Sequence, residues 1–358
     1  MTGLNRFWIG SEEIKLPGKY SPMEPLGQGA YGIVFKAKDI RTGENVAIKK
    51  LRLSPDKPFL LRSALREVVV LARLNHRNVV RILSLYSSSP LIRDIYMIFN
   101  LMETDLASVI ASKQTLSMNQ VRFLFYQLLV GLAYIHSVGV MHRDIKPRNL
   151  LVNSNCHLRI GDFGLARTRS CGGNLTEYVC TRWYRAPEIL CKVLTYDLKV
   201  DIFSAGCVLA EIVCRKPLLP GFNTLSQISL FIQRFGMQSP ADIEWIPGKE
   251  FPKFINKVSK IVSPLGDLDG FMESAGVSYH LEPVNRIVRD MCTMNPCKRP
   301  SAEDMLENVW FESFPRGDTE TLRGSEVRIP VPQLWDPVII KQEMRTEMAI
   351  IAINNNRL

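Results

Sequence analysis

The sequence predicts an α+β protein with two lobes, a small β-rich N-terminal lobe containing one key helix and a larger, mostly α-helical lobe. Three observations lead to this fold class. Short runs of β-branched and aromatic residues, separated by turn residues, dominate the first hundred positions. One segment with helical apolar spacing interrupts these runs. Beyond residue 102, helical spacing predominates.

Strand-type runs define the small lobe. Residues 33–35 (Ile-Val-Phe) and 46–48 (Val-Ala-Ile) are β-branched or apolar, and residues 41–43 (Arg-Thr-Gly) between them signal a turn. A third run at 95–99 (Ile-Tyr-Met-Ile-Phe) leads into residues 100–102, which we expect to form the hinge to the larger lobe.

A helix is predicted from about Pro58 to Leu74. Its apolar residues recur at helical spacing, at Leu61, Ala64, Leu65, Val68, Leu71 and Ala72. Arg62, Arg66 and Arg73 lie off this stripe.

The larger lobe is predicted from helical segments and one irregular segment. Apolar residues between 121 and 135 form a wide helical face, and residues 202–213 are apolar nearly all round, which is typical of a central buried helix. Gly and Pro cluster between Pro247 and Gly276 and predict an irregular insertion. From Asp336 onwards, apolar residues at roughly helical spacing predict a tail that packs back on the body.

Composition narrows the class further. A length of 358 residues with 46% apolar residues suits two packed lobes and argues against global disorder. We interpret the formal net charge of +10 as a solvated basic surface, since no basic run, zinc-ligand spacing or aromatic-rich motif predicts a nucleic-acid partner. The eight cysteines form no C-x-x-C pair and are expected to be reduced. In the absence of an apolar signal core and of a membrane-length apolar run, we expect a cytoplasmic and nuclear location and no membrane association.

A glycine-rich motif spans residues 27–32, and its members are Gly27, Gln28, Gly29, Ala30, Tyr31 and Gly32. Dinucleotide-binding folds share this G-x-G-x-x-G pattern, but in those folds the turn opens a helix. Here residues 33–35 continue as a strand, so a β-hairpin over phosphate groups fits better. Glycines let backbone amides approach phosphate oxygens without a Cβ clash.

Lys49 follows the apolar run Val46-Ala47-Ile48 within a predicted strand. A buried ammonium is costly unless its charge is paired, and Glu67 on the following predicted helix can supply the partner. The alternative is a lysine whose side chain reaches water along an apolar surface.

The strongest pattern is His142-Arg143-Asp144-Ile145-Lys146-Pro147-Arg148-Asn149, followed by Asp162-Phe163-Gly164. Together with the glycine-rich motif and Lys49, these residues closely resemble the signature of the protein kinases. The resemblance covers about Tyr20 to Phe314 and implies the bilobal protein kinase fold.

The same resemblance extends to Ala186-Pro187-Glu188, Asp201 and Arg299. In the family, Glu188 pairs with Arg299, and Asp201 braces the catalytic loop. The implied organisation is an N-terminal extension at 1–19, an N-lobe at 20–102, a C-lobe at 103–314 with a family insertion at about 237–285, and a C-terminal extension at 315–358 that packs back on the body.

The resemblance implies the chemistry of ATP-dependent phosphoryl transfer. Asp144 would accept the proton of the attacking hydroxyl, Lys146 would steady the γ-phosphate, and Asn149 and Asp162 would hold Mg2+. Lys49, paired with Glu67, would contact the other phosphates, so that one magnesium–nucleotide is held between two lobes. The remaining nucleotide contacts implied by the family are Gly27, Gln28, Gly29, Ala30, Gly32, Val34, Ala47, Asn100, Met102, Asp105 and Leu151.

Residues 176–185 (Thr-Glu-Tyr-Val-Cys-Thr-Arg-Trp-Tyr-Arg) resemble the activation lip of the mitogen-activated protein kinases, as does the hinge sequence 101–106. A Thr-x-Tyr lip also occurs in cyclin-dependent-kinase-like and male-germ-cell-associated kinases. The resemblance implies activation by phosphorylation of Thr176 and Tyr178. Arg66, Arg143 and Arg167 would receive the phosphate of Thr176, and Arg182 and Arg185 that of Tyr178.

The resulting expectation is a proline-directed serine/threonine kinase, a monomer in a signalling cascade. Its partners would be protein substrates, an upstream dual-specificity kinase and phosphatases. A cyclin-dependent kinase, which needs a partner subunit, and a pseudokinase scaffold are the alternatives. The scaffold requires loss of Lys49, Asp144, Asn149 or Asp162, and all four are present.

Some residues depart from the family pattern. Asn100 is usually acidic, tryptophan is usual at Phe203, and Phe99 should narrow the back of the nucleotide pocket. The acidic docking patch is thin, with Asp318 and Glu320 its main candidates, which puts conventional docking of basic partner motifs in doubt.

Overall fold

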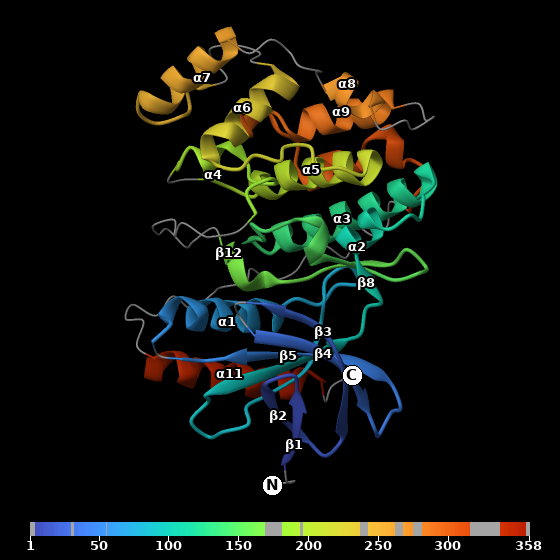
Figure 1. Cartoon of the computed structure of the whole chain (residues 1–358), viewed down its shortest axis with the longest axis vertical. Helices are drawn as coiled ribbons and strands as arrows, with labels where there is room; N and C mark the ends of the chain where they lie inside the picture. The colour runs from blue at the N-terminus through green and yellow to red at the C-terminus, as the bar shows by residue number, and fades with distance from the viewer. Residues whose placement is uncertain are drawn as a thin grey trace. The chain divides into compact units, whose positions relative to one another are not determined.

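The computed structural model describes residues 4–29, 32–54, 56–168, 181–193, 196–236, 243–261, 268–274, 281–315 and 337–355. The chain divides into two compact units (Figure 1). Unit 1 comprises Met1–Glu103, Asp162–Leu165 and Ile329–Leu358, and unit 2 comprises Thr104–Gly161 and Ala166–Arg328. Unit 1 is built on a β-sheet and unit 2 is mainly helical, so the predicted α+β class is confirmed.

The main sheet of unit 1 is antiparallel, with strand order β3-β4-β5-β7-β6. Its strands are β3 (Tyr20–Gly29), β4 (Gly32–Asp39), β5 (Asn45–Arg52), β6 (Ile82–Tyr86) and β7 (Asp94–Asn100). Side chains alternate across the sheet, so Val46 and Ile48 are buried in the core while Ala47 and Lys49 lie on the opposite face.

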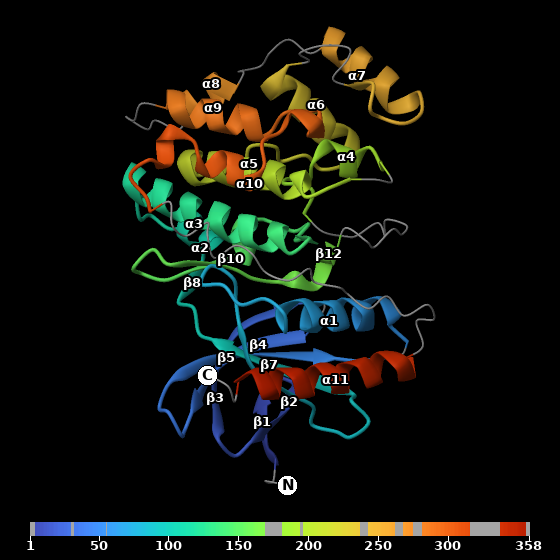
Figure 2. The same cartoon turned by 180° about the vertical axis from the view of Figure 1, so that it is seen from behind.

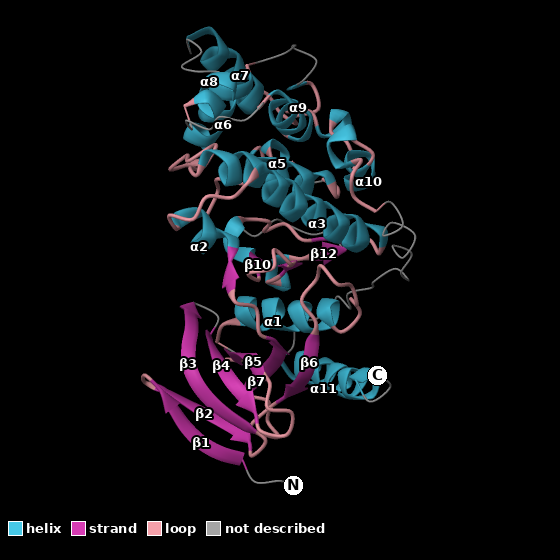
Figure 3. Ribbon diagram, turned by 90° about the vertical axis from the view of Figure 1, so that its right-hand side faces the viewer, coloured by secondary structure: helices cyan, strands magenta, loops and turns pink. Residues whose placement is uncertain are grey.

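An N-terminal hairpin, β1 (Leu4–Ile9) and β2 (Glu12–Pro17), covers one face of this sheet (Figure 3). Ile14 and Leu16 are fully buried and belong to one apolar cluster with Phe35 and Ile48. The hairpin lies within the N-terminal extension expected at 1–19, where the alternation of Ile14 and Leu16 with charged residues is a strand pattern.

Two helices complete unit 1, α1 (Pro58–Leu71) and α11 (Pro337–Asn355). Helix α1 ends three residues before the predicted Leu74. Helix α11 packs against α1 (Figure 2) and β6 (Figure 3), and Ile340, Met344 and Ile351 are buried. Because α1 is contacted by α11 and by residues 163–165, nearly every residue of α1 from Leu61 onwards is buried, including residues off its apolar stripe.

Unit 2 contains short strands and most of the helices. Its strands are β8 (Thr104–Asp105), β9 (Val140–Met141), β10 (Leu150–Val152), β11 (Leu158–Ile160) and β12 (Arg167–Thr168). Its helices are α2 (Leu106–Ala111), α3 (Met118–Ser137), α4 (Pro187–Leu190), α5 (Lys199–Cys214), α6 (Thr224–Phe235), α7 (Glu250–Ile261), α8 (Leu268–Glu273), α9 (Glu282–Met291) and α10 (Ala302–Leu306).

The predicted central helix is confirmed, since α5 is buried from Val200 to Cys214. The prediction of an irregular segment between Pro247 and Gly276 is wrong in part, because α7 and α8 lie within it. Pro252 is compatible with α7 because it lies in the first turn, where backbone N–H groups have no intrahelical partner. No helix in the described segments has the length and apolar character needed to cross a bilayer, and the described cysteines are free thiols.

Candidate active site

The glycine-rich motif forms the β3–β4 hairpin, in which Gly27 lies opposite Val34. Gly32 has a φ of +151°, and a Cβ there would lie 1.9 Å from the carbonyl oxygen of Lys50 on β5. Only glycine fits this close approach of β4 to β5. Ala30 and Tyr31 at the tip lie outside the described residues.

Lys49 on β5 contacts its expected partner Glu67 and, in addition, Asp162. Its Nζ lies 2.7 and 2.8 Å from the two carboxylate oxygens of Glu67 on α1 and 3.4 Å from Oδ1 of Asp162. The Lys49 side chain is 18% exposed and that of Glu67 only 5%, whereas Asp162 is 45% exposed. The expectation of a paired, rather than a water-reaching, lysine therefore holds in the structure.

Burial and charge act in opposite directions on this cluster. Burial lowers the pKa of Lys49, but the Glu67 and Asp162 carboxylates outweigh it and hold the pKa above its ordinary value. Burial raises the pKa of Glu67, and the charge of Asp162 adds to this effect, while Lys49 opposes it. Lys49 is therefore a permanent cation at neutral pH, ready to attract an anionic group.

The segment after Asp162 is anchored to α1. The carbonyl oxygen of Gly164 accepts hydrogen bonds from Ser63 Oγ (2.8 Å) and from the Arg66 guanidinium (3.0 Å). A Cβ at Gly164 would lie 2.8 Å from Ser63 Oγ. Ser63, Arg66 and Glu67 share one face of α1, because residues three and four positions apart are neighbours on a helix.

The second cluster lies in unit 2, in the loop between β9 and β10. Lys146 Nζ donates to Asp144 Oδ2 at 2.6 Å. The Asn149 side-chain nitrogen donates to the carbonyl oxygen and to Oδ2 of Asp144, at 2.8 and 2.9 Å. Asp144, Lys146 and Asn149 are thus held together by direct side-chain hydrogen bonds.

Asp201, at the start of α5, fixes the backbone of this loop. Its carboxylate accepts hydrogen bonds from the backbone N–H of His142 (2.8 Å) and of Arg143 (2.7 Å), and it lies 2.9 Å from His136 Nε2. Burial raises the pKa of Asp201, but these hydrogen bonds and the nearby histidines outweigh burial and lower it. The carboxylate therefore stays ionised in a fully buried position.

His142 connects the loop to the segment before Asp162. Its Nδ1 accepts from the Asp144 backbone N–H at 3.2 Å, so Nε2 carries the proton that points to the Gly161 carbonyl oxygen at 2.9 Å. Ser63, His136 and His142 belong to this network, although the sequence motifs give none of them a role. The i, i+4 spacing of Ser63 and Glu67 was the one available signal for Ser63.

The other expected nucleotide contacts fall into two groups. In unit 1, Val34 pairs with Lys49 and Ala47 with Phe99 across neighbouring strands, and the half-buried Met102 follows β7. In unit 2, Leu151 pairs with Asp105, whose carboxylate also caps α2 through the Ser108 N–H at 2.9 Å. Asn100, at the end of β7, is exposed.

The predicted pair of Glu188 and Arg299 is buried and bidentate, with distances of 2.5 and 2.7 Å. The Arg299 guanidinium also lies over the Phe203 ring, 5.2 Å from its centroid. Phenylalanine therefore supplies an aromatic face at the position where tryptophan is usual.

The residues expected to respond to phosphorylation are described only in part. Thr176 and Tyr178 lie outside the described residues, whereas Arg182 and Arg185 lie in a half-buried turn. Arg143 has a φ of 68° and lies 5.4 Å from the Tyr196 ring centroid, and Arg167 is in β12. Arg66 is buried, although it lies off the apolar stripe of α1.

The residues of this site lie within a region of the chain that is similar in sequence to known proteins. The protein kinase domain model matches residues 20–311. This chain belongs to the protein kinase family. It is 43% identical over 339 residues to mitogen-activated protein kinase 7 of Arabidopsis thaliana, covering 92% of this chain and 89% of that protein. It is 40% identical over 296 residues to mitogen-activated protein kinase 4 of Oryza sativa subsp. japonica, covering 82% and 78%.

The chain is thus a serine/threonine protein kinase of the mitogen-activated type. Asp162 and Asn149 offer a carboxylate and an amide oxygen, the ligand types that Mg2+ accepts when phosphates complete its coordination. Within the described segments, no group of three or more His, Cys, Asp and Glu side chains could hold a metal ion on its own.

Proposed function

We propose that this kinase phosphorylates serine or threonine residues that precede proline, and that phosphorylation of both Thr176 and Tyr178 activates it. The observation that carries the proposal is the Thr-Glu-Tyr lip in a chain whose named relatives are mitogen-activated protein kinases. Protein substrates, an upstream dual-specificity kinase and phosphatases would be its partners in a signalling cascade in the cytoplasm and nucleus.

In the proposed reaction, the substrate hydroxyl oxygen attacks the γ-phosphorus of ATP, and the bond from that phosphorus to the bridging oxygen breaks. ADP leaves with the electron pair, and Asp144 accepts the hydroxyl proton. Asn149 orients Asp144 through its 2.9 Å hydrogen bond to Oδ2. Lys146, 2.6 Å from the same oxygen, would neutralise charge on the transferring group.

Lys49 would bind the non-transferred phosphates, because Glu67 holds its ammonium in place with two short hydrogen bonds. Asp162 and Asn149 would hold Mg2+, which would neutralise charge on the nucleotide phosphates when it is bound. Val34, Ala47, Met102 and Leu151 offer the apolar contacts that a purine base needs.

Activation follows from charge on the lip. A phosphate on Thr176 would carry between one and two negative charges at neutral pH, which the guanidinium groups of Arg66, Arg143 and Arg167 could bind through charge-assisted hydrogen bonds. Arg66 also donates to the Gly164 carbonyl oxygen, two residues after Asp162. A phosphate held by Arg66 would therefore be linked to the position of the Asp162 segment.

The proline preference has a backbone explanation. Residues 180–185 resemble a lip that leaves the substrate residue after the target without a partner for its backbone N–H. Proline has no N–H to leave unsatisfied, so it alone avoids the cost, which is about 1–3 kcal/mol for a buried donor.

The test measures radiolabelled phosphate transfer to peptides. Wild-type chain phosphorylated on both lip residues should label a Ser-Pro peptide at least about tenfold faster than its Ser-Ala counterpart. Asp144→Ala should reduce transfer by about 10²–10⁴-fold. Thr176→Ala and Tyr178→Phe should each prevent activation by the upstream kinase. Equal transfer by wild type and Asp144→Ala, or activation of both lip variants, would contradict the proposal.

A further inference from the structure

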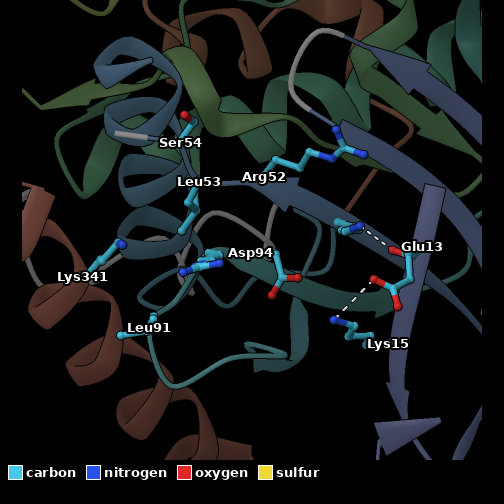
Figure 4. A pocket seen from close by; sticks show the side chains of 10 residues that line it. Glu13, Lys15, Arg52, Leu53, Ser54, Leu91, Asp94 and Lys341 are labelled. Atoms are coloured by element: carbon cyan, nitrogen blue, oxygen red, sulfur yellow. Dashed lines mark hydrogen bonds and ion pairs between the residues drawn. The ribbon is translucent and has the colours of Figure 1, made fainter. Parts of the chain in front are cut away.

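A hollow lined by charged and apolar side chains lies in unit 1, away from the residues assigned to catalysis (Figure 4). Its volume is about 650 Å³, within the range of roughly 300–1,000 Å³ typical of small-ligand pockets. Basic side chains from separate elements line it, namely Lys15 of β2, Lys50 and Arg52 of β5, Arg93 just before β7, and Lys341 of α11.

The carboxylates around the hollow are already engaged. Asp94 accepts hydrogen bonds from the Ser88 backbone N–H (3.0 Å) and from Ser88 Oγ (2.6 and 2.8 Å). Glu13 lies 3.4 Å from Lys15 Nζ. Glu12 lies 2.6 Å from the Arg52 guanidinium and 3.4 Å from Lys50 Nζ.

Glu12 must be counted as a full negative charge. Burial raises its pKa, but Arg52 and Lys50 outweigh burial and lower the pKa below its ordinary value. Counting Glu12, five cations face three carboxylates, which leaves two positive charges in excess.

The excess is carried by Arg93 and Lys341. Neither has an ion pair within the part of the chain that the structure describes. They approach the hollow from different elements, so a single ligand could contact both. Leu53 and the exposed Leu91 add apolar surface beside them.

We propose that this hollow binds a phosphate monoester, with its phosphate on Arg93 and Lys341 and its organic part against Leu53 and Leu91. A phosphate monoester carries between one and two negative charges at neutral pH, which matches the excess of two better than a single carboxylate does. Arginine suits a phosphate because its planar donors can bind two oxygens at once.

The hollow is separate from the nucleotide contacts of the same unit. Lys49 and Lys50 are consecutive on β5, so their side chains lie on opposite faces of the sheet. Moreover, β2 and α11 lie outside residues 20–311, the range that the protein kinase domain model matches. The proposed site therefore depends on segments that flank the kinase domain, and it goes beyond the proposed function.

The test is binding of a fluorescently labelled phosphoserine peptide with leucine beside the phosphoserine, followed by anisotropy. The full chain would be compared with the double variant Arg93→Gln/Lys341→Gln and with the matched control Lys38→Gln/Arg41→Gln, which removes two exposed cations of the same unit. All three proteins keep the arginines expected to bind the lip phosphates, so any binding of the peptide to those arginines contributes equally to the three affinities. We expect the first double variant to lose affinity about tenfold or more, and the control to stay within about twofold of wild type.

Two further probes identify the ligand. A peptide with glutamate in place of phosphoserine should bind more weakly, since it carries a single charge. Inorganic phosphate should compete with the phosphopeptide; equal affinity would mark a free phosphate as the ligand, and a preference for the phosphopeptide would mark a phosphoprotein segment.

The site is independent of catalysis, so both double variants should transfer phosphate to a generic basic protein at the wild-type rate and unfold at the wild-type temperature. Unchanged phosphopeptide affinity in a folded Arg93→Gln/Lys341→Gln variant would overturn the proposal. This result would leave the proposed kinase function untouched.

Discussion

Arg143 and Asp162, which flank the proposed chemistry, both have left-handed backbone conformations, with φ values of 68° and 59°. Such conformations cost a non-glycine residue about 1–3 kcal/mol, so neighbouring contacts must stabilise them. For Arg143, the Asp201 carboxylate binds its backbone N–H directly at 2.7 Å. By holding the backbone of Arg143, the buried carboxylate of Asp201 helps to fix the orientation of Asp144, the residue that follows Arg143.

Gly32 gives a prediction at the same scale. Gly32→Ala should lower the free energy of unfolding by at least about 2 kcal/mol, because the new Cβ would overlap the Lys50 carbonyl oxygen and φ is unfavourable for alanine. Urea unfolding would measure the change. Gly27→Ala is the matched control, since a Cβ there meets no atom within 4 Å and should change stability by less than about 1 kcal/mol. Equal losses in the two variants would show that the close approach is not the cause.

At the scale of elements, α1 connects three parts of unit 1. Glu67 holds Lys49 on β5, Ser63 and Arg66 hold Gly164, and the residue just beyond its end, Arg73, binds α11. The Arg73 guanidinium makes two hydrogen bonds of 2.8 Å to the carboxylate of Glu347, whose side chain is only 2% exposed. The position of α1 therefore depends on a helix more than 270 residues away in sequence.

Removing one partner of this pair should cost more than removing both. Arg73→Met leaves the Glu347 charge buried without its partner and should destabilise the chain by about 2–4 kcal/mol. The double variant Arg73→Met/Glu347→Met should recover at least about 1 kcal/mol of this loss, because it leaves no buried charge. Urea unfolding of the wild type, both single variants and the double variant tests the pair, and additive losses would contradict this account.

Apolar periodicity predicted burial where the residues of an element are themselves apolar. It did not predict burial that depends on contact with a segment distant in sequence. Helix α5 was predicted as buried because it is apolar on all sides. The burial of Arg66 could not be read from the stripe on α1, because it depends on Gly164. In the insertion, Pro247 and Gly248 precede α7 and Pro252 lies in its first turn, where the missing backbone N–H is tolerated.

For the molecule as a whole, the switch depends on charges drawn from separate segments. Arg167→Ala should reduce the activity of the doubly phosphorylated kinase about tenfold or more, because one charge-assisted hydrogen bond to phosphate is worth about 1.5–3 kcal/mol. The unmodified kinase has no lip phosphate and should change by less than about threefold. Initial rates of both forms, with phosphorylation verified by mass spectrometry, decide the matter; an equal fall would make Arg167 a structural residue.

The candidate site was predictable to the extent that its residues occur in local motifs. Lys49, Asp144, Asn149 and Asp162 were identified from short patterns, and the structure groups them as two clusters. The hollow around Lys50 had no such pattern, since its basic residues come from positions 15 to 341. Only the packing of the terminal hairpin and α11 on the sheet brings those residues together.

The adjacent lysines of β5 carry a consequence for any change in that strand. Because side chains alternate with a period of two, deleting one residue between the β4–β5 turn and Ile48 would transpose the two ammonium groups. Lys50, which now lies near Glu12, would then face Glu67. Lys49, which now pairs with Glu67, would face the carboxylates of the β1–β2 hairpin. Two ion pairs, Lys49 with Glu67 and Lys50 with Glu12, therefore fix the length of the strand at this point. An insertion or deletion here should be tolerated far less than one at the exposed Arg41–Gly43 turn.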